Sequence, residues 1–167
     1  MGELEHKSQA PASVACCVLT VSDTRTAETD TSGRAIRALL EGAGHTITGH
    51  AIVRDEPQEV STRVRDWLTE AGTQVIITTG GTGITSRDGT YEAVGGLLDK
   101  RLDGFGELFR MLSFEEIGPA AMMSRAAAGT AKGKAVFVLP GSESAVRLAM
   151  TRLILPEIGH VVQQLRT

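Results

Sequence analysis

The chain has 167 residues, of which 41% are hydrophobic and 4% aromatic, and it can form one domain with an aliphatic core. Seventeen basic residues against 20 acidic ones give a net charge of −3. That charge argues against non-specific binding to nucleic acids or anionic membranes, since both need a large cationic field. No apolar run reaches the roughly 18 residues that span a bilayer. The N-terminal sequence MGELEHKSQAPAS lacks the hydrophobic core of a signal peptide, so we expect a cytoplasmic protein with no membrane partner.

The first half of the chain predicts alternating strands and helices. Residues 1–12 are polar and are expected to form a disordered tail before a single domain over residues 13–167. The unbroken apolar run 14–21 is typical of a buried strand. A polar loop leads to a helix that is expected to begin near residues 30–32 and to end at Gly42 and Gly44. A second, less apolar strand over 45–53 is expected nearer the sheet edge.

The second half continues this alternation. Helical spacing of four apolar side chains predicts a helix after RDEPQ, and a third strand over 74–79 enters a glycine-rich loop. Residues 91–98, 106–117 and 119–128 are predicted to be helical. Residues 134–139 form another buried strand, and a long final helix follows, in which Pro156 allows a kink.

Buried strands that alternate with helices predict an α/β fold whose parallel sheet is covered on both faces. Ligands of such sheets bind outside the carboxyl ends of the strands. The loops 22–32, 54–57, 80–90 and 139–143 therefore come first in a search for a site.

The glycine-rich loop TTGGTG follows the third strand. It is not a P-loop, because Ile84 and Thr85 stand where a Lys-Ser/Thr pair is needed, and Ser86 breaks the dinucleotide fingerprint. Exposed backbone N–H groups, with the hydroxyls of Thr79 and Thr82, could still hold a phosphate. The alternative is a plain strand-to-helix turn; the position at the end of a buried strand favours the ligand.

Two aspartates near these loops have competing interpretations. Asp88 either caps a helix near Thr90, for which Thr90 is the better placed cap, or binds Mg²⁺ beside phosphates; spacing alone does not separate these roles. Asp55, with Gln58 three residues later, fits a capping box better than a catalytic group.

Two polar segments next to apolar sequence are further candidates for anion binding. Arg125 follows Ser124 in an apolar stretch and either reaches water or meets an anion, with a surface position slightly favoured. Gly141 and Ser142 follow the last strand, where backbone N–H groups bind an anion or Ser142 simply caps the final helix.

Three segments together resemble the MoaB/MogA family of molybdenum cofactor biosynthesis proteins. They are TTGGTGITSRDGTYEA, FGELFRMLSFEEIGPAAMMSRAAAG and VFVLPGSESA, in the family's order and spacing, and the second is more similar to the MoaB branch. The resemblance covers essentially residues 14–165. It implies a three-layer αβα fold with a mostly parallel central sheet, assembly as trimers or hexamers, and molybdopterin binding. It leaves open molybdenum or tungsten use.

Active members of the family adenylylate molybdopterin with Mg-ATP and prepare it for molybdate insertion, so the molybdate-inserting enzyme is an expected partner. By motif, the resemblance implies that Asp88 and Asp55 are catalytic and hold Mg²⁺. It assigns ligand binding to Thr79, Gly80, Gly81, Thr82, Gly83, Ser124, Arg125, Ser22, Asp23, Gly141 and Ser142. The sequence departs from the usual family stretch at Ser86 and Tyr91, which stand in place of prolines. A carrier or scaffold that binds the pterin without catalysis is the alternative.

Overall fold

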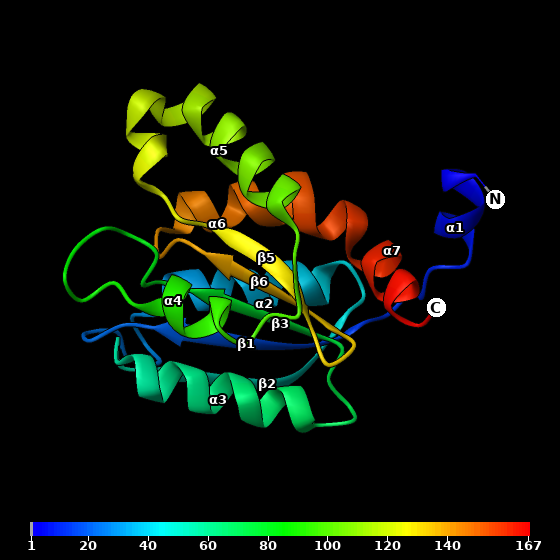
Figure 1. Ribbon diagram of the computed structural model, residues 1–167, viewed down its shortest axis with the longest axis horizontal. Coiled ribbons are helices and arrows are strands. Elements are labelled where there is room, and N and C mark those ends of the chain that lie inside the picture. The colour runs from blue at the N-terminus through cyan, green and yellow to red at the C-terminus, as the bar shows by residue number, and fades with distance from the viewer. Residues whose placement is uncertain (1) are drawn as a thin grey trace.

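An inner strand of the sheet, β1 (Ala15–Val21), contains the adjacent cysteines and is buried along most of its length, as its apolar sequence predicts. The computed structural model describes residues 2–167, apart from the side chains of Glu3, Leu4 and His6. Its other strands are β2 (Thr46–Val53), β3 (Val75–Thr79), β4 (Lys100–Arg101), β5 (Ala127–Ala131) and β6 (Lys134–Leu139). They form one sheet in the order β2-β1-β3-β6-β5-β4 (Figure 1), which confirms an edge position for β2.

The sheet is mostly parallel, as predicted. Strands β2, β1, β3 and β6 pair in parallel, whereas β5 runs antiparallel to both β6 and β4. Thr20 is in register with Thr79, and Thr79 is in register with Leu139. The carboxyl ends of β1, β3 and β6 therefore lie side by side.

Helices cover both faces of this sheet and make three layers. One face packs against α2 (Thr31–Gly42), α5 (Asp103–Ile117), α6 (Glu143–Ala149) and α7 (Leu155–Leu165); the other packs against α3 (Pro57–Thr69) and α4 (Thr90–Gly95). The predicted inner face of α3 is confirmed, since Val60, Val64, Trp67 and Leu68 are all buried. Within the described residues, no helix is long and apolar enough to cross a membrane.

The prediction of a helix over residues 119–128 is wrong. A 3₁₀ helix, η1 (Gly118–Met123), is followed by β5, which forms a hairpin with β6. Lys132 and Gly133 make its two-residue turn, with φ angles of 49° and 76°, as a type I′ turn requires. Strand pairing overrides the helical preference of the alanines here.

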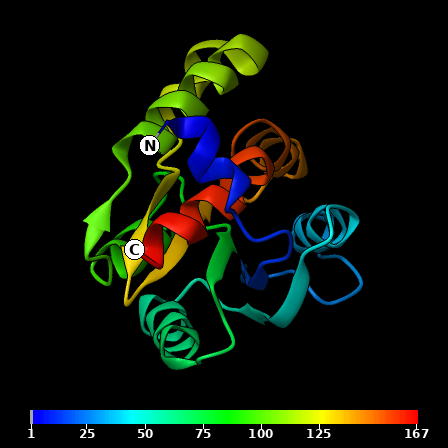
Figure 2. The same cartoon turned by 90° about the vertical axis from the view of Figure 1, so that its right-hand side faces the viewer.

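The two ends of the chain contain helices that meet, and the interruption of the final helix near Pro156 agrees with the predicted kink. The segment expected to be a disordered tail contains a short helix, α1 (Glu3–Ser8), which lies beside α7 (Figure 2), although Met1 lies outside the described residues. Lys7 Nζ lies 2.6 Å from Glu157 Oε1 and ties α1 to α7. The final helix is interrupted by a π-helical turn, η2 (Met150–Ile154), just before Pro156, whose missing N–H breaks the regular ladder.

Candidate functional site

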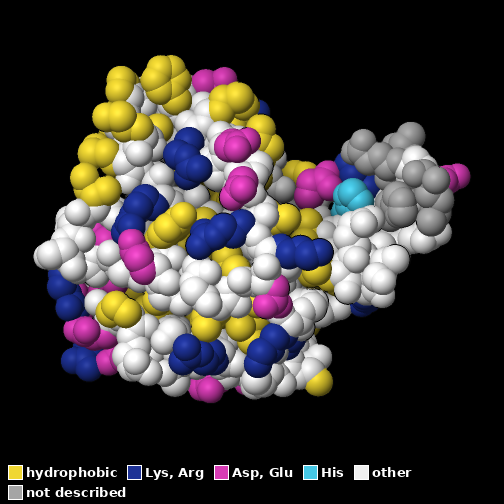
Figure 3. Space-filling model, in the orientation of Figure 1, with side chains coloured by type: hydrophobic (Ala, Val, Ile, Leu, Met, Phe, Trp, Pro, Cys, Tyr) yellow, Lys and Arg dark blue, Asp and Glu magenta, His cyan; other side chains and the backbone are white. Residues whose placement is uncertain are grey.

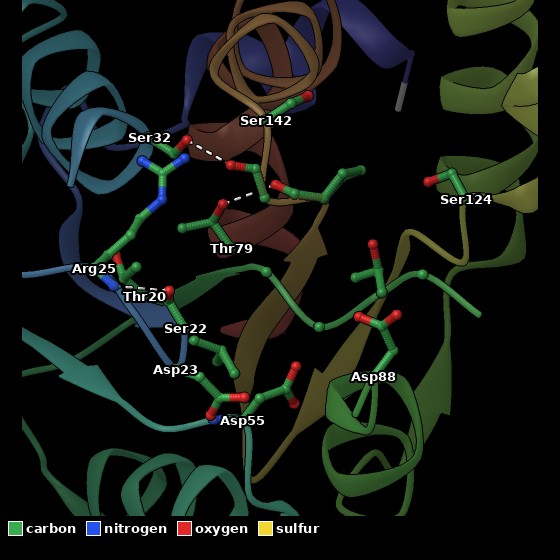
Figure 4. Close-up of a pocket in the computed structure, with 17 residues that line it drawn as sticks. Thr20, Ser22, Asp23, Arg25, Ser32, Asp55, Thr79, Asp88, Ser124 and Ser142 are labelled. Atoms are coloured by element: carbon green, nitrogen blue, oxygen red, sulfur yellow. Dashed lines mark hydrogen bonds between the residues drawn. The ribbon is translucent and has the colours of Figure 1, made fainter. Parts of the chain in front are cut away.

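The carboxyl ends of β1, β3 and β6 bound a cavity of about 580 Å³ (Figure 4). Its lining consists of Thr20, Val21, Ser22, Asp23, Arg25, Ser32, Asp55, Thr79, Gly80, Gly81, Thr82, Gly83, Asp88, Ser124, Pro140, Gly141 and Ser142. The strand register brings together loops that are more than 50 residues apart in the chain. All the ligand-binding and metal-binding residues implied by the resemblance line this cavity, with Arg125 as the exception.

The glycine loop follows β3 and needs its first two glycines for steric reasons. Gly80 has a φ of 103°, and a Cβ atom there would lie 2.1 Å from the carbonyl oxygen of Val21. Gly81 has a φ of 72°, and a Cβ there would lie 2.0 Å from the hydroxyl of Thr90. Both positions combine a left-handed backbone with close contact, so any side chain would displace the loop.

Only part of this loop is available to a ligand. The hydroxyl of Thr79 donates to the carbonyl of Pro140 at 2.7 Å, and the N–H of Gly80 donates to Leu139 at 3.0 Å. Within the described residues, the N–H groups of residues 81–83 donate to no backbone carbonyl. The sequence interpretation in which the Thr79 hydroxyl contacts a phosphate is therefore replaced by one in which it fixes the loop after β6.

Asp55 follows β2 and is buried, with 8% of the residue exposed. Its Oδ1 atom has no hydrogen-bond partner among the described residues. The capping-box interpretation is wrong, because Glu56 is the N-cap of α3 and makes no side-chain cap. Burial raises the pKa of Asp55, the carboxylates of Asp88 and Asp23 add to the shift, and a backbone hydrogen bond from Gly89 opposes it.

Asp88 closes its own loop. Its Oδ2 atom accepts hydrogen bonds from the backbone N–H of Thr85 at 2.9 Å and from the Thr85 hydroxyl at 2.7 Å. Gly89 is the N-cap of α4, so neither Asp88 nor Thr90 caps this helix. The hydroxyl of Thr90 is buried and without a partner in the described part of the chain. Asp88 is thus held with its carboxylate in the cavity wall.

An ion-paired bridge crosses the rim of the cavity. Arg87, in the loop after β3, donates to both carboxylate oxygens of Asp23 at 3.0 and 2.9 Å and to Glu56 at 2.9 Å. The hydrogen bonds from Arg87 lower the pKa of Asp23, which also accepts from the backbone N–H of Asp55 at 3.0 Å. The loops that follow β1, β2 and β3 are therefore joined at one point.

Arg125 braces the glycine loop. Its guanidinium donates to the carbonyls of Gly83 at 3.0 Å and Asp88 at 3.2 Å, pairs with Glu92, and lies over the Tyr91 ring. Arg125 is half-buried, and the anion that it meets is the carboxylate of Glu92 within the protein. It does not line this cavity.

Its neighbour Ser124 does line the cavity, and the Ser124 hydroxyl is buried without a partner in the described part of the chain. At the opposite wall, Ser142 accepts from the N–H of Ala145 at 3.3 Å and caps α6, which confirms the capping interpretation. Ser32 donates to the carbonyl of Gly141 at 2.7 Å.

Sequence reasoning missed Arg25 and Ser32. Arg25 is the one cation among the lining residues, and its guanidinium donates to the Thr31 hydroxyl at 2.9 Å. The N–H of Arg25 and that of Thr24 donate to Ser22, which folds the chain back after β1. The signal for Arg25 was its place in the loop 22–32, which had already been selected.

The carboxylates fit an open cation site better than a closed one. No group of three or more His, Cys, Asp or Glu side chains is arranged to hold a metal within the described residues. Mg²⁺ commonly uses one or two carboxylates and takes its remaining ligands from water and substrate phosphates. The partnerless Oδ1 of Asp55 and the nearby carboxylate of Asp88 fit that requirement.

These features define a three-layer α/β protein with a polar cavity at the carboxyl ends of its parallel strands. A family model described as "Probable molybdopterin binding domain" matches residues 17–160. The chain is 52% identical over 166 residues to a Bacillus cereus protein named Molybdenum cofactor biosynthesis protein B, covering 99% of this chain and 98% of the relative. It therefore belongs to the MoaB/MogA family of molybdenum cofactor biosynthesis proteins.

Solved structures agree with this assignment. A crystal structure of a Molybdenum cofactor biosynthesis protein B superposes with a TM-score of 0.91 at 52% identity, covering 95% of this chain and 99% of that one. The tungsten cofactor synthesizing protein MoaB from Pyrococcus furiosus gives a TM-score of 0.85 at 38% identity, covering 95% of this chain and 100% of its own. A MogA structure, at 29% identity and a TM-score of 0.83, covers 90% of this chain and 99% of its own, so the chain is more similar to the MoaB branch.

Proposed function

We propose that this protein binds molybdopterin and adenylylates it with Mg-ATP. A terminal phosphate oxygen of the pterin forms a bond to the α-phosphorus of ATP, the bond from that phosphorus to the β-phosphate oxygen breaks, and pyrophosphate leaves. Family membership supports the pterin as ligand. The proposal rests on the cavity in which the N–H groups of the glycine loop adjoin the buried Asp55 carboxylate, whose Oδ1 atom has no partner among the described residues.

The backbone would hold the phosphates. The N–H groups of residues 81–83 have no protein partner in the described part of the chain and can donate to phosphate oxygens. Arg125 keeps this loop in place through the carbonyls of Gly83 and Asp88. Such preorganisation favours catalysis because the donors need not move as the reaction proceeds.

The carboxylates would hold the cation. Asp55 and Asp88 would bind Mg²⁺, which when present neutralises phosphate charge. The bridge from Arg87 to Asp23 fixes the backbone N–H of Asp55 and so positions the Asp55 carboxylate. Ser124 and Arg25 offer a hydroxyl and a cation to the anionic parts of the ligands.

The experiment combines purified protein, Mg-ATP and molybdopterin and measures adenylylated pterin and pyrophosphate, with pterin binding measured separately. We expect Asp88→Asn to reduce adenylylation by orders of magnitude while pterin binding survives. Thr85→Ala is the matched control, because it removes a hydrogen bond from Asp88 but keeps the charge. Equal losses in the two variants, or loss of pterin binding in Asp88→Asn, would assign Asp88 a structural role. Pterin binding without pyrophosphate release by the wild type would favour a carrier.

We also propose that the chain self-associates through an apolar surface on α5 and η1. Figure 3 shows hydrophobic side chains gathered over this end of the molecule. The surface consists of Leu108, Met111, Phe114, Ile117, Met122 and Met123, which are 45–80% exposed. The opposite face of α5 buries Phe109 and Leu112 against the sheet, so this helix is apolar on two sides. A patch of that kind is typical of a protein interface.

Sedimentation analysis tests this surface. We expect the wild type to be oligomeric and Phe114→Glu to shift the distribution towards monomer. Ile84→Glu, which changes an equally prominent apolar side chain outside the surface, is expected to leave the assembly intact. An unchanged assembly in Phe114→Glu would place the interface elsewhere.

A further inference from the structure

A second cavity of about 450 Å³ lies next to the first and shares Ser124 with it. It is bounded by the start of α5, the segment around β4 and the chain that leads into β5. Its lining consists of Tyr91, Arg101, Leu102, Asp103, Gly106, Glu107, Arg110, Met122, Ser124, Arg125, Ala126, Ala127 and Ala128. The adenylylation proposed above uses only Ser124 and Arg125 from this set, and the proposed self-association surface uses Met122.

The two cavities differ in charge. Three aspartates and one arginine line the first cavity, whereas three arginines, one aspartate and one glutamate line the second. The first cavity is therefore acidic overall, whereas in the second the positive charge is concentrated at the guanidinium groups.

Two of these arginines are positioned by neutral groups. Arg110 donates to the carbonyls of Ala126 at 2.9 Å and Ser124 at 3.4 Å. Arg101 donates to the hydroxyl of Tyr91 at 3.3 Å and lies over its ring at 5.5 Å. Arg125, in contrast, is paired with Glu92.

Within the described residues, neither Arg101 nor Arg110 has a carboxylate within 4.0 Å, although Asp103 and Glu107 line the same cavity. Arg101 is exposed and Arg110 is half-buried. A half-buried cation such as Arg110 normally acquires an anionic partner, because its charge is poorly solvated. The protein holds these two guanidinium groups in place and leaves their charge without a partner.

Small residues keep space beside the guanidinium groups. A Cβ atom on Gly106 would lie 2.6 Å from a terminal nitrogen of Arg110 and 2.9 Å from the carbonyl oxygen of Ala126, so glycine leaves room for this guanidinium and for the chain that enters β5. The facing wall is formed by the alanines at 126–128. Larger side chains at these positions would fill the cavity.

From these observations we propose that the second cavity binds an oxyanion group of about the size of phosphate, held by Arg101 and Arg110. Guanidinium groups bind such oxyanions with charge-assisted hydrogen bonds. The oxyanion comes either as a free inorganic ion or as the phosphate group of a larger ligand. The buried, partnerless hydroxyl of Ser124 lies between the two cavities and can donate to a ligand in either one.

Calorimetric titration of the full chain with inorganic phosphate, and separately with AMP, tests the proposal. We expect Arg101→Gln to weaken binding about tenfold, because one charge-assisted hydrogen bond is lost. Glu107→Gln is expected to strengthen binding, because it removes a negative charge from the lining. Arg65→Gln, which removes an exposed cation from α3 on the other face of the sheet, is the matched control and should bind like the wild type.

The two ligands distinguish the sources of the oxyanion. Binding of inorganic phosphate that depends on Arg101 supports a free ion, and binding of AMP alone that depends on Arg101 supports the phosphate group of a larger ligand. Unchanged affinity in Arg101→Gln overturns the proposal, as does binding of neither ligand by the wild type. A loss in Arg25→Gln without a loss in Arg101→Gln would place the anion in the first cavity and overturn it too.

Discussion

Replacing Asp55 with Asn should raise the free energy of unfolding and reduce the stabilisation that Mg-ATP gives to the folded protein. Asp55 is buried with a partnerless oxygen, and the carboxylates of Asp88 and Asp23 lie nearby. Asn has nearly the same shape but no charge. The substitution therefore removes the desolvation and repulsion that the ionised carboxylate suffers in the folded protein.

The size of this gain in stability follows from the buried Oδ1 atom of Asp55, which has no hydrogen-bond partner among the described residues. A buried polar group without a partner costs about 1–3 kcal/mol, and Asn removes only the part that is due to charge. We expect a gain of about 1 kcal/mol in the free energy of unfolding at pH 7, or about 2–4 °C in melting temperature for a chain of this size.

The gain should depend on pH. The pKa of Asp55 is raised in the folded protein, so the folded state binds the proton more tightly than the unfolded state. The free energy of unfolding of the wild type therefore increases as the pH falls through the folded pKa of Asp55. The difference in stability between Asp55→Asn and the wild type disappears below the unfolded pKa of about 3.9.

Thermal unfolding with and without Mg-ATP measures both effects. The wild type should be stabilised by the ligand, and Asp55→Asn should lose most of that response because it no longer offers a full negative charge to the cation. Asp66→Asn, an exposed position on α3, is the control that should behave like the wild type in both respects. A less stable Asp55→Asn protein at pH 7, or one with an unchanged response to Mg-ATP, would refute the reasoning.

Three further outcomes follow from the structure. Gly80→Ala should lower the free energy of unfolding, measured in urea, by at least about 1–3 kcal/mol, because it adds a clash with Val21 to a strained backbone. Gly44→Ala is the control, since Gly44 has a φ of 90° but open space around it, and it should cost less. Equal costs would show that the clash does not contribute. Ser142→Ala should lose about 1 kcal/mol in the same assay, since it removes the cap of α6; an unchanged midpoint would show that the cap adds nothing. Burial raises the pKa of Cys16 to about 12, so this thiol should resist a thiol reagent at pH 8 until the protein unfolds, and rapid labelling of the native protein would contradict its burial.

The sequence predicted the parallel part of the sheet because its strands are unbroken apolar runs. Strands β1, β3 and β6 were recognised in this way, and the polar loops at their carboxyl ends became the cavity wall. Strand β5 was missed because AAGTA is dominated by alanine and glycine, and its pairing with β6 depends on the turn at Lys132 and Gly133.

The roles of individual polar side chains were harder to predict. Whether Asp55 caps a helix or remains without a partner depends on how deeply the end of β2 is buried, which the local sequence does not encode. Arg125 could not be understood without knowing that it reaches carbonyls about 40 residues earlier in the chain. Likewise, the presence of two adjacent cavities that share Ser124 depends on tertiary packing.

A single-turnover reaction tests most directly whether the first cavity, at the carboxyl ends of β1, β3 and β6, transfers an adenylyl group. Protein in excess over molybdopterin is mixed with Mg-ATP labelled at the α-phosphate, and label in the pterin is followed together with pyrophosphate. We predict equal amounts of labelled pterin and pyrophosphate in the wild type and a loss of both in Asp88→Asn. Saturated pterin binding with neither product would contradict catalysis.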